Sequence, residues 1–124
     1  MSDGRHARGR DAENAVEDFL VERGFAILAR NLRLGPLEID VLAVKDGLAV
    51  LVEVRTRGSG SYLPALASIT SKKRATILRA AERLWRTRLA KMRGIDRMRI
   101  DVAAVTLSDV DEARVEYIEG AITA

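Results

Sequence analysis

The segment PLEIDVLAVKDGLAVLVEVRTR, from Pro36 to Arg57, predicts a β-hairpin and raises a question about charge. Two apolar runs flank Asp46-Gly47, and an Asp-Gly pair between such runs is a strong signal for a tight hairpin turn. Three carboxylates nevertheless stand inside these runs, namely Glu38, Asp40 and Glu53. Burying an ionised carboxylate costs on the order of several kcal/mol unless the group is paired or binds a cation. The hairpin therefore predicts a partner for these acids.

A two-residue turn at Asp46-Gly47 fixes which residues of the two strands lie opposite one another. Asp40 then faces Glu53, and Glu38 faces Arg55, all four on one face because strand side chains alternate between faces. The other face would carry only apolar pairs, namely Ile39 with Val54, Val41 with Val52 and Ala43 with Val50.

Directly opposed carboxylates, with Cβ atoms about 5 Å apart, repel one another. A divalent cation would remove the repulsion, and oxygen ligands at this separation suit Mg²⁺ or Mn²⁺. Two alternatives remain open from the residues alone. Either one carboxyl is protonated, or Arg55 pairs with both Glu38 and Glu53.

The composition is that of one globular domain. The chain has 124 residues, of which 48% are hydrophobic and 31% charged, and no apolar run approaches the ~20 residues that span a bilayer. It has no cysteine and a single histidine, His6, so disulfides, thiolate metal sites and histidine-based zinc sites are excluded. We expect a flexible basic leader over residues 1–8, a single domain over 9–124, a cytoplasmic location, and no membrane partner.

The positive charge is strongly segregated. The net charge is only +3, yet between Lys72 and Arg99 only Glu82 and Asp96 oppose a run of cations. These are Lys72, Lys73, Arg74, Arg79, Arg83, Arg86, Arg88, Lys91, Arg93, Arg97 and Arg99. Such segregation favours an anionic partner, nucleic acid before membrane, although a solvated helix face is the alternative.

Periodicity predicts a mixed α/β fold with one helix on each side of a sheet. Helices are expected over residues 10–23 and from Thr70 or Ser71 to about 92, the second with a buried stripe. Strands are expected over 25–33, 37–44, 48–56 and 98–107, with a short edge strand within 113–120. The segment GSGSY, residues 58–62, is expected to be a loop, either a connector or one that closes over a nucleic-acid strand.

Several stretches together resemble a known family. Asp40 in one strand, followed by Glu53 and Arg55 in the next, resembles the signature of the PD-(D/E)xK nuclease superfamily with its last lysine changed. The stretches GRDAENAVEDFLVERGFAILARNLR, LEIDVLAVKDGLAVLVEVRTR, SITSKKRATILRAAERL and RIDVAAV occur in order from Gly9 to Val105. They resemble the UPF0102 family of predicted endonucleases, which is related in fold to archaeal Holliday-junction resolvases. This resemblance implies a restriction-endonuclease-like α-β-β-β-α-β core, with a central mixed sheet flanked by helices.

The resemblance also implies roles for individual residues. Asp40 and Glu53 would be metal ligands, Glu13 an accessory acid at the same metal, and Glu38 would orient a water or hold Arg55. From the residues alone, Glu13 fits a favourable charge near a helix N-terminus better.

The chain departs from the family pattern at three positions. Arg55 replaces the family's usual lysine; it can supply charge and donors but no proton transfer, because a guanidinium is effectively never deprotonated. Lys72 and Lys73 are spatial alternatives for that lysine. Leu37 and Tyr62-Leu63 replace a usual Gly and a usual aromatic-Gly pair.

The function predicted is Mg²⁺- or Mn²⁺-dependent cleavage of DNA phosphodiester bonds, with branched DNA as one candidate substrate and a homodimer left open. Lys72, Lys73, Arg74 and Arg79 would contact phosphates, or else point into solvent. With aromatics at 4%, backbone and shape readout is expected rather than base stacking. Two alternatives are a DNA-binding module of the same fold with impaired catalysis, and a structural domain whose basic helix binds an acidic protein.

Overall fold

The computed structural model describes residues 4–58, 65–107 and 113–123. The helices are α1 (Gly4–Glu22) and α2 (Ser71–Thr87), with short 3₁₀ turns at Ala65–Ser68 and Leu89–Lys91. The strands are β1 (Ala26–Leu34), β2 (Leu37–Lys45), β3 (Leu48–Gly58), β4 (Arg97–Leu107) and β5 (Arg114–Ile118). The predicted loop at residues 58–62 lies outside the described residues apart from Gly58, and so does Tyr62-Leu63.

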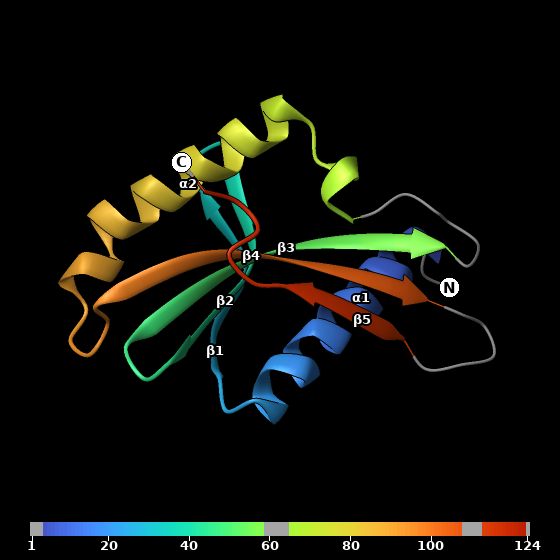
Figure 1. The fold of residues 1–124 in the computed structure, drawn as a ribbon, viewed down its shortest axis with the longest axis horizontal. Coiled ribbons are helices and arrows are strands. Elements are labelled where there is room, and N and C mark those ends of the chain that lie inside the picture. Colours follow the sequence, from blue (N-terminus) through green and yellow to red (C-terminus); the bar gives the residue numbers. More distant parts are fainter. Residues whose placement is uncertain (1–3, 59–64, 108–112, 124) are drawn as a thin grey trace.

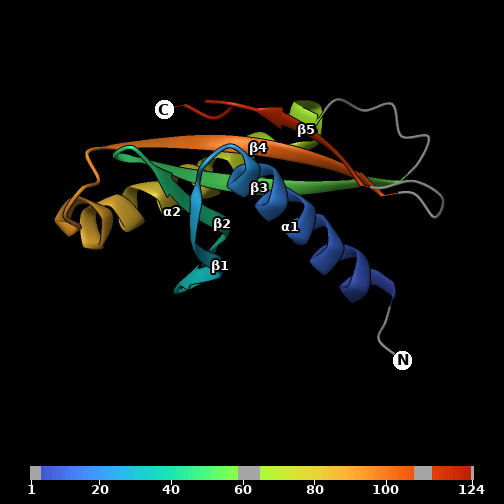
Figure 2. The same cartoon turned by 90° about the horizontal axis from the view of Figure 1, so that it is seen from below.

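The five strands form one mixed sheet in the order β1-β2-β3-β4-β5. All neighbours are antiparallel except β3 and β4, which are parallel and joined by the crossover that contains α2. Figure 1 shows α2 on one side of the sheet and α1 on the other. In Figure 2, α1 leans away from the sheet toward its N-terminal end. The predicted α/β class, the element order and the edge position of β5 are confirmed.

The hairpin turn adopts the predicted register. Asp46 and Gly47 have φ angles of 49° and 82°, the left-handed pair that a two-residue hairpin turn requires. Lys45 faces Leu48, and the pairing continues to Val41 opposite Val52. Beyond that pair the backbone ladder stops, and the carboxylate of Asp40 instead accepts a hydrogen bond from the N–H of Val54 at 2.8 Å.

The prediction that Ile39 and Val54 share one apolar face is wrong. Ile39 packs in the core between the sheet and α2, whereas Val54 packs against the core on the α1 side. Val41 packs on the α1 side like Val54, so the alternation of β2 breaks between Ile39 and Val41. The register places Asn31 of β1 opposite Asp40 at this break, and Asn31 has a positive φ of 52°.

The helix boundaries differ from the predicted ones at two places. Helix α1 begins at Gly4 rather than Arg10, so it extends into the segment predicted as a leader. Helix α2 is capped as predicted, with the Thr70 hydroxyl accepting from the N–H of Lys73 at 3.1 Å, but it ends at Thr87. Arg88 leaves helical geometry at φ −132°, and a 3₁₀ turn follows. Within the described residues, neither helix is long and apolar enough to cross a bilayer.

Candidate metal and nucleic-acid site

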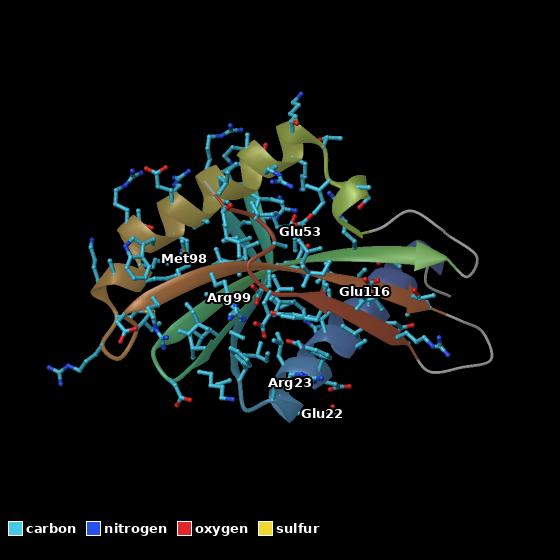
Figure 3. All side chains as sticks on the ribbon, viewed as in Figure 1. Glu22, Arg23, Glu53, Met98, Arg99 and Glu116 are labelled. Atoms are coloured by element: carbon cyan, nitrogen blue, oxygen red, sulfur yellow. The ribbon has the colours of Figure 1, made fainter. Side chains whose placement is uncertain are left out.

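The hairpin register brings Asp40 and Glu53 together, as predicted. Glu53 leaves the sheet on the α2 side, near the N-terminal turns of that helix (Figure 3). The Glu53 side chain is only 8% exposed, and a hydrogen bond joins it to Asp40. One oxygen of Asp40 also holds the N–H of Val54. We call these two residues the carboxylate pair.

Burial and mutual repulsion perturb the carboxylate pair. Desolvation, followed by the charge of Asp40, raises the pKa of Glu53 to about 7. Desolvation also raises the pKa of Asp40, and the charge of Glu38 adds to this effect, while the N–H of Val54 opposes it. Below about pH 7, and without a cation, Glu53 therefore keeps its proton and donates to Asp40. This is one of the two alternatives that the sequence left open.

Two cations flank Glu53. Arg55 Nε and Lys73 Nζ each lie 3.7 Å from the same oxygen, Glu53 Oε1. Lys73 comes from the first turn of α2. A lysine is thus present beside Glu53 even though position 55, where the family usually has lysine, carries arginine. The Nε–H of Arg55 is buried and has no hydrogen-bond partner among the described residues. A donor left unpaired in this way costs about 1–3 kcal/mol, and a water or a ligand oxygen would satisfy it.

Glu38 and Glu13 border the pair without joining it. Glu38 is exposed, and among the described residues no ion pair links it to Arg55, so the predicted clamp of Arg55 between two glutamates is not observed. Glu13 accepts from the side chain of Asn31 at 3.1 Å and lies 3.8 Å from Arg30 Nε. Desolvation, together with the charges of Asp40 and Glu38, raises the pKa of Glu13, so it senses the pair electrostatically.

The donor set suits a hard divalent cation held by two carboxylates. In the part of the chain that the structure describes, no group of three or more His, Cys, Asp or Glu side chains is arranged to hold a metal. Mg²⁺ is commonly bound through only one or two carboxylates, with waters and substrate phosphates completing its shell. Asp40 and Glu53 meet that requirement, because a cation would replace their shared proton. Glu13, held by Arg30 and Asn31, is not part of this set.

The four predicted phosphate contacts on α2 do not lie together. Lys72 and Arg79 are exposed, Lys73 turns toward Glu53, and Arg74 is half-buried. At 3.6 residues per turn, Arg74 falls on the border of the helix away from Lys72. Of these four residues, only Lys72 and Arg79 therefore lie on the same exposed face of α2.

The sequence analysis missed a buried network around Asp101. This side chain is fully buried and accepts from both Arg99 Nε (2.8 Å) and Arg99 Nη2 (2.9 Å). The hydroxyl of Tyr117 and the N–H of Gly120 donate to the same carboxylate. The signal was available, because Arg99 and Asp101 are two residues apart in a strand and so share a face. The network ties β5 and the segment after it to β4.

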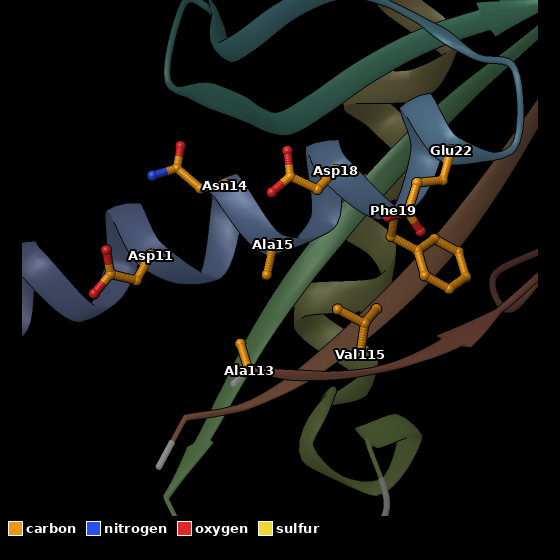
Figure 4. A pocket seen from close by; sticks show the side chains of 8 residues that line it. All are labelled: Asp11, Asn14, Ala15, Asp18, Phe19, Glu22, Ala113 and Val115. Atoms are coloured by element: carbon orange, nitrogen blue, oxygen red, sulfur yellow. The ribbon is translucent and has the colours of Figure 1, made fainter. Parts of the chain in front are cut away.

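Helix α1 and the start of β5 line a separate open pocket of about 530 Å³ (Figure 4). Its lining includes the acids Asp11, Asp18 and Glu22 and the ring of Phe19. None of the predicted site residues reaches it. The carboxylate pair therefore lies outside this pocket.

Comparison with known proteins places this chain in a family. A family model described as "Uncharacterised protein family UPF0102" matches residues 12–105. The chain belongs to the UPF0102 family. A UPF0102 protein of Sorangium cellulosum is 50% identical over 120 residues, covering 97% of this chain and 83% of that protein. One from Burkholderia thailandensis is 42% identical over 97 residues, covering 77% of this chain and 65% of the other.

Among solved structures, the chain is similar to Pyrococcus furiosus SfsA in complex with Ca²⁺, with a TM-score of 0.47 and 13% identity over 97% of this chain and 65% of that one. The UPF0102 match itself contains the carboxylate pair, Arg55, Lys73 and Glu13, and it ends at Val105 before β5 begins. The candidate site thus lies within the family region, whereas Tyr117, which completes the Asp101 network, lies beyond it.

Proposed function

We propose that this UPF0102 protein is a divalent-metal-dependent nuclease that hydrolyses phosphodiester bonds in DNA. The observation that carries the proposal is the carboxylate pair itself. Two acids share one proton in a nearly closed position, at the start of a helix with six cations and one acid. Burial and the neighbouring charge of Asp40 raise the pKa of Glu53 to about 7, so the ionised pair is unfavourable unless a positive charge compensates it. A cation that displaces the proton would supply this charge.

The residues divide the work as follows. Asp40 and Glu53 would hold the cation, which, when bound, would make a water more acidic and stabilise charge on the phosphate oxygens. Arg55, whose Nε–H has no partner in the described part of the chain, would donate to a phosphate oxygen, and Lys73 adds a second positive charge beside Glu53. Such preorganised donors stabilise a charged transition state without reorganising. The water oxygen bonds to phosphorus and gives one proton to solvent, while the bond to the leaving oxygen breaks and that oxygen takes up a proton from solvent.

The direct test is a cleavage assay with Mg²⁺ or Mn²⁺ on linear, flapped and four-way DNA. Glu53→Gln and Asp40→Asn preserve side-chain size and remove the cation's ligands, so each should abolish cleavage. Asp18→Asn is the matched control, because Asp18 lines the separate α1–β5 pocket, and this variant should cleave like the wild type. If the wild type cuts none of the substrates with either metal, the nuclease proposal fails.

One observation favours a second candidate, a DNA-binding module of the same fold that does not cleave. Glu13, the accessory acid of the resemblance, is engaged by Arg30 and Asn31, and position 55 carries arginine. The module would bind DNA through α2 while the carboxylate pair stayed protonated. It predicts DNA affinity that is equal in Mg²⁺ and in EDTA, and no cleavage by the wild type.

A further inference from the structure

Four exposed cations form a straight row along α2. They are Lys72, Arg79, Arg83 and Arg86, and at 100° per residue they stay within a narrow stripe on the helix surface. We call them the cationic stripe. Only Glu82 on this helix is acidic, and its contact with Arg86 joins two side chains that are 76% and 69% exposed. Exposed pairs of that kind contribute little, so the charge of the stripe remains available to a ligand.

The stripe begins in the first turn of α2, where the Lys72 side chain points about 100° around the helix from that of Lys73. Lys73, the neighbour of its first member, contacts Glu53. Farther along, the Nη1 of Arg83 donates to the carbonyl of Leu34 at 3.2 Å. The stripe therefore runs beside the end of the β1–β2 hairpin, on the same side of the sheet as the pair. Figure 1 shows α2 extending across the sheet as one uninterrupted helix.

The length and rigidity of the stripe define the ligand. Fourteen residues separate Lys72 from Arg86, so at 1.5 Å per residue the row is about 21 Å long. Phosphates advance about 3.4 Å per nucleotide along each strand of a duplex, so the row matches about six base pairs. A straight helix offers its cations in a line, which suits a stiff duplex better than a flexible single strand.

The surface lacks the groups that a single strand would need. Proteins that bind single strands stack bases on aromatic side chains. The only aromatic residue of α2 is Trp85, which lies on the opposite border and lines an apolar cavity with Met98 and Ile122. The stripe therefore offers cations for the phosphate backbone and no aromatic surface on which bases could stack.

We propose that the substrate carries a duplex arm of about six base pairs or more on one side of the scissile bond, and that the cationic stripe tracks this arm. The inference deepens the proposed nuclease function and rests on it. A single strand, or an arm shorter than the stripe, leaves part of the row without phosphates. Such substrates should bind and react poorly.

The test uses junction substrates in which a single strand meets duplex arms of 2, 4, 6, 8 and 12 base pairs. For the wild type, kcat/KM should rise with arm length and level off at about six to eight base pairs. Binding of the same substrates by Glu53→Gln should follow the same curve. Removing two phosphate contacts with Arg79→Gln/Arg86→Gln should make the slope of log K against log salt shallower by about 1.8 and remove the dependence on arm length.

The matched control is Arg23→Gln/Arg114→Gln, which removes the same charge from the end of α1 and from β5 and should retain the wild-type curve. Equal kcat/KM for 2- and 12-base-pair arms would overturn the inference while the nuclease proposal stands. Binding that depends on arm length, without cleavage of any substrate, would support the contact between the stripe and a duplex arm and would overturn the proposed nuclease function. Equal salt slopes for the stripe variant and the control would overturn the proposed contact with a duplex arm. An affinity for poly-L-glutamate equal to that for the DNA substrates would also overturn it.

Discussion

Replacing Glu53 by glutamine should stabilise the metal-free protein at pH 8 and change its stability little at pH 4.5. The reason is burial of a carboxyl that must ionise beside Asp40, which raises the pKa of Glu53 from 4.5 to about 7. A raised carboxyl pKa means that the folded chain binds a proton that the unfolded chain has already released. Stability is therefore lost as pH rises through the window from 4.5 to 7.

The magnitude follows from the two pKa values. Each unit of difference between the folded and unfolded chain corresponds to about 1.36 kcal/mol. Ionisation of Glu53 therefore costs about 3 kcal/mol at pH 8 and about 0.4 kcal/mol at pH 4.5. For a chain of 124 residues, 3 kcal/mol corresponds to a rise in Tm of about 10 °C. Glutamine removes the cost, although Lys73 and Arg55 then lose an anionic partner, so the measured gain should lie below this value.

The assay is urea unfolding in EDTA at pH 4.5 and pH 8. Glu82→Gln is the control, because Glu82 is exposed and should respond by no more than about 0.5 kcal/mol at either pH. Saturating Mg²⁺ at pH 8 should then narrow the gap, because only the wild type holds the ion. If Glu53→Gln proves less stable than the wild type at pH 8, Lys73 and Arg55 fully stabilise the ionised carboxylate, and the argument from a shared proton fails.

Two further variants test the flanking cations and the buried network. Arg55→Lys should maintain or raise the cleavage rate if position 55 acts on phosphate, and should mainly lower Tm if Arg55 is a structural clamp. If Lys73→Ala reduces kcat, adding Arg55→Lys to that variant should restore cleavage at unchanged KM. Nicking assays and thermal melts measure these effects. Asp101→Asn should cost about 3–5 kcal/mol in urea unfolding, because Arg99 would be left without its buried counter-charge, while cleavage at low temperature should persist.

The fold could be predicted because its main signals are local. Asp46-Gly47 fixes the hairpin register through backbone geometry alone, and the register in turn brings Asp40 beside Glu53. The apolar period of the second helix likewise predicted a buried stripe, which Ile77, Ala80, Ala81 and Leu84 form in α2. Each of these features is decided by residues close together in the sequence. Turn geometry and helical periodicity are therefore sufficient to predict them.

The errors occur where distant parts of the chain decide the outcome. Ile39 packs toward α2 because the alternation of β2 breaks next to Asp40, where the ladder with β3 has ended, and the sequence of β2 does not reveal this break. The contact of Lys73 with Glu53 depends on where α2 packs on the sheet. Glu13 finds Arg30 and Asn31 only because α1 crosses β1. Tertiary packing, which sequence spacing does not encode, sets all three.

Two irregular features meet at the carboxylate pair. The backbone pairing of β2 with β3 ends there, and two carboxyl groups lie side by side. The backbone ladder between β2 and β3 stops at Val41 and Val52, and Asp40 fills the next position by accepting the N–H of Val54. Asp40 thus presents a carboxylate oxygen where a regular sheet would place a backbone partner. Glu53 lies next to it, nearly closed to water, with Arg55 and Lys73 beside it. Under the proposed function, a cation bound by Asp40 and Glu53 would replace the proton between them. The break in alternation that makes the prediction at Ile39 wrong therefore adjoins Asp40, the residue that brings Glu53 a second carboxylate.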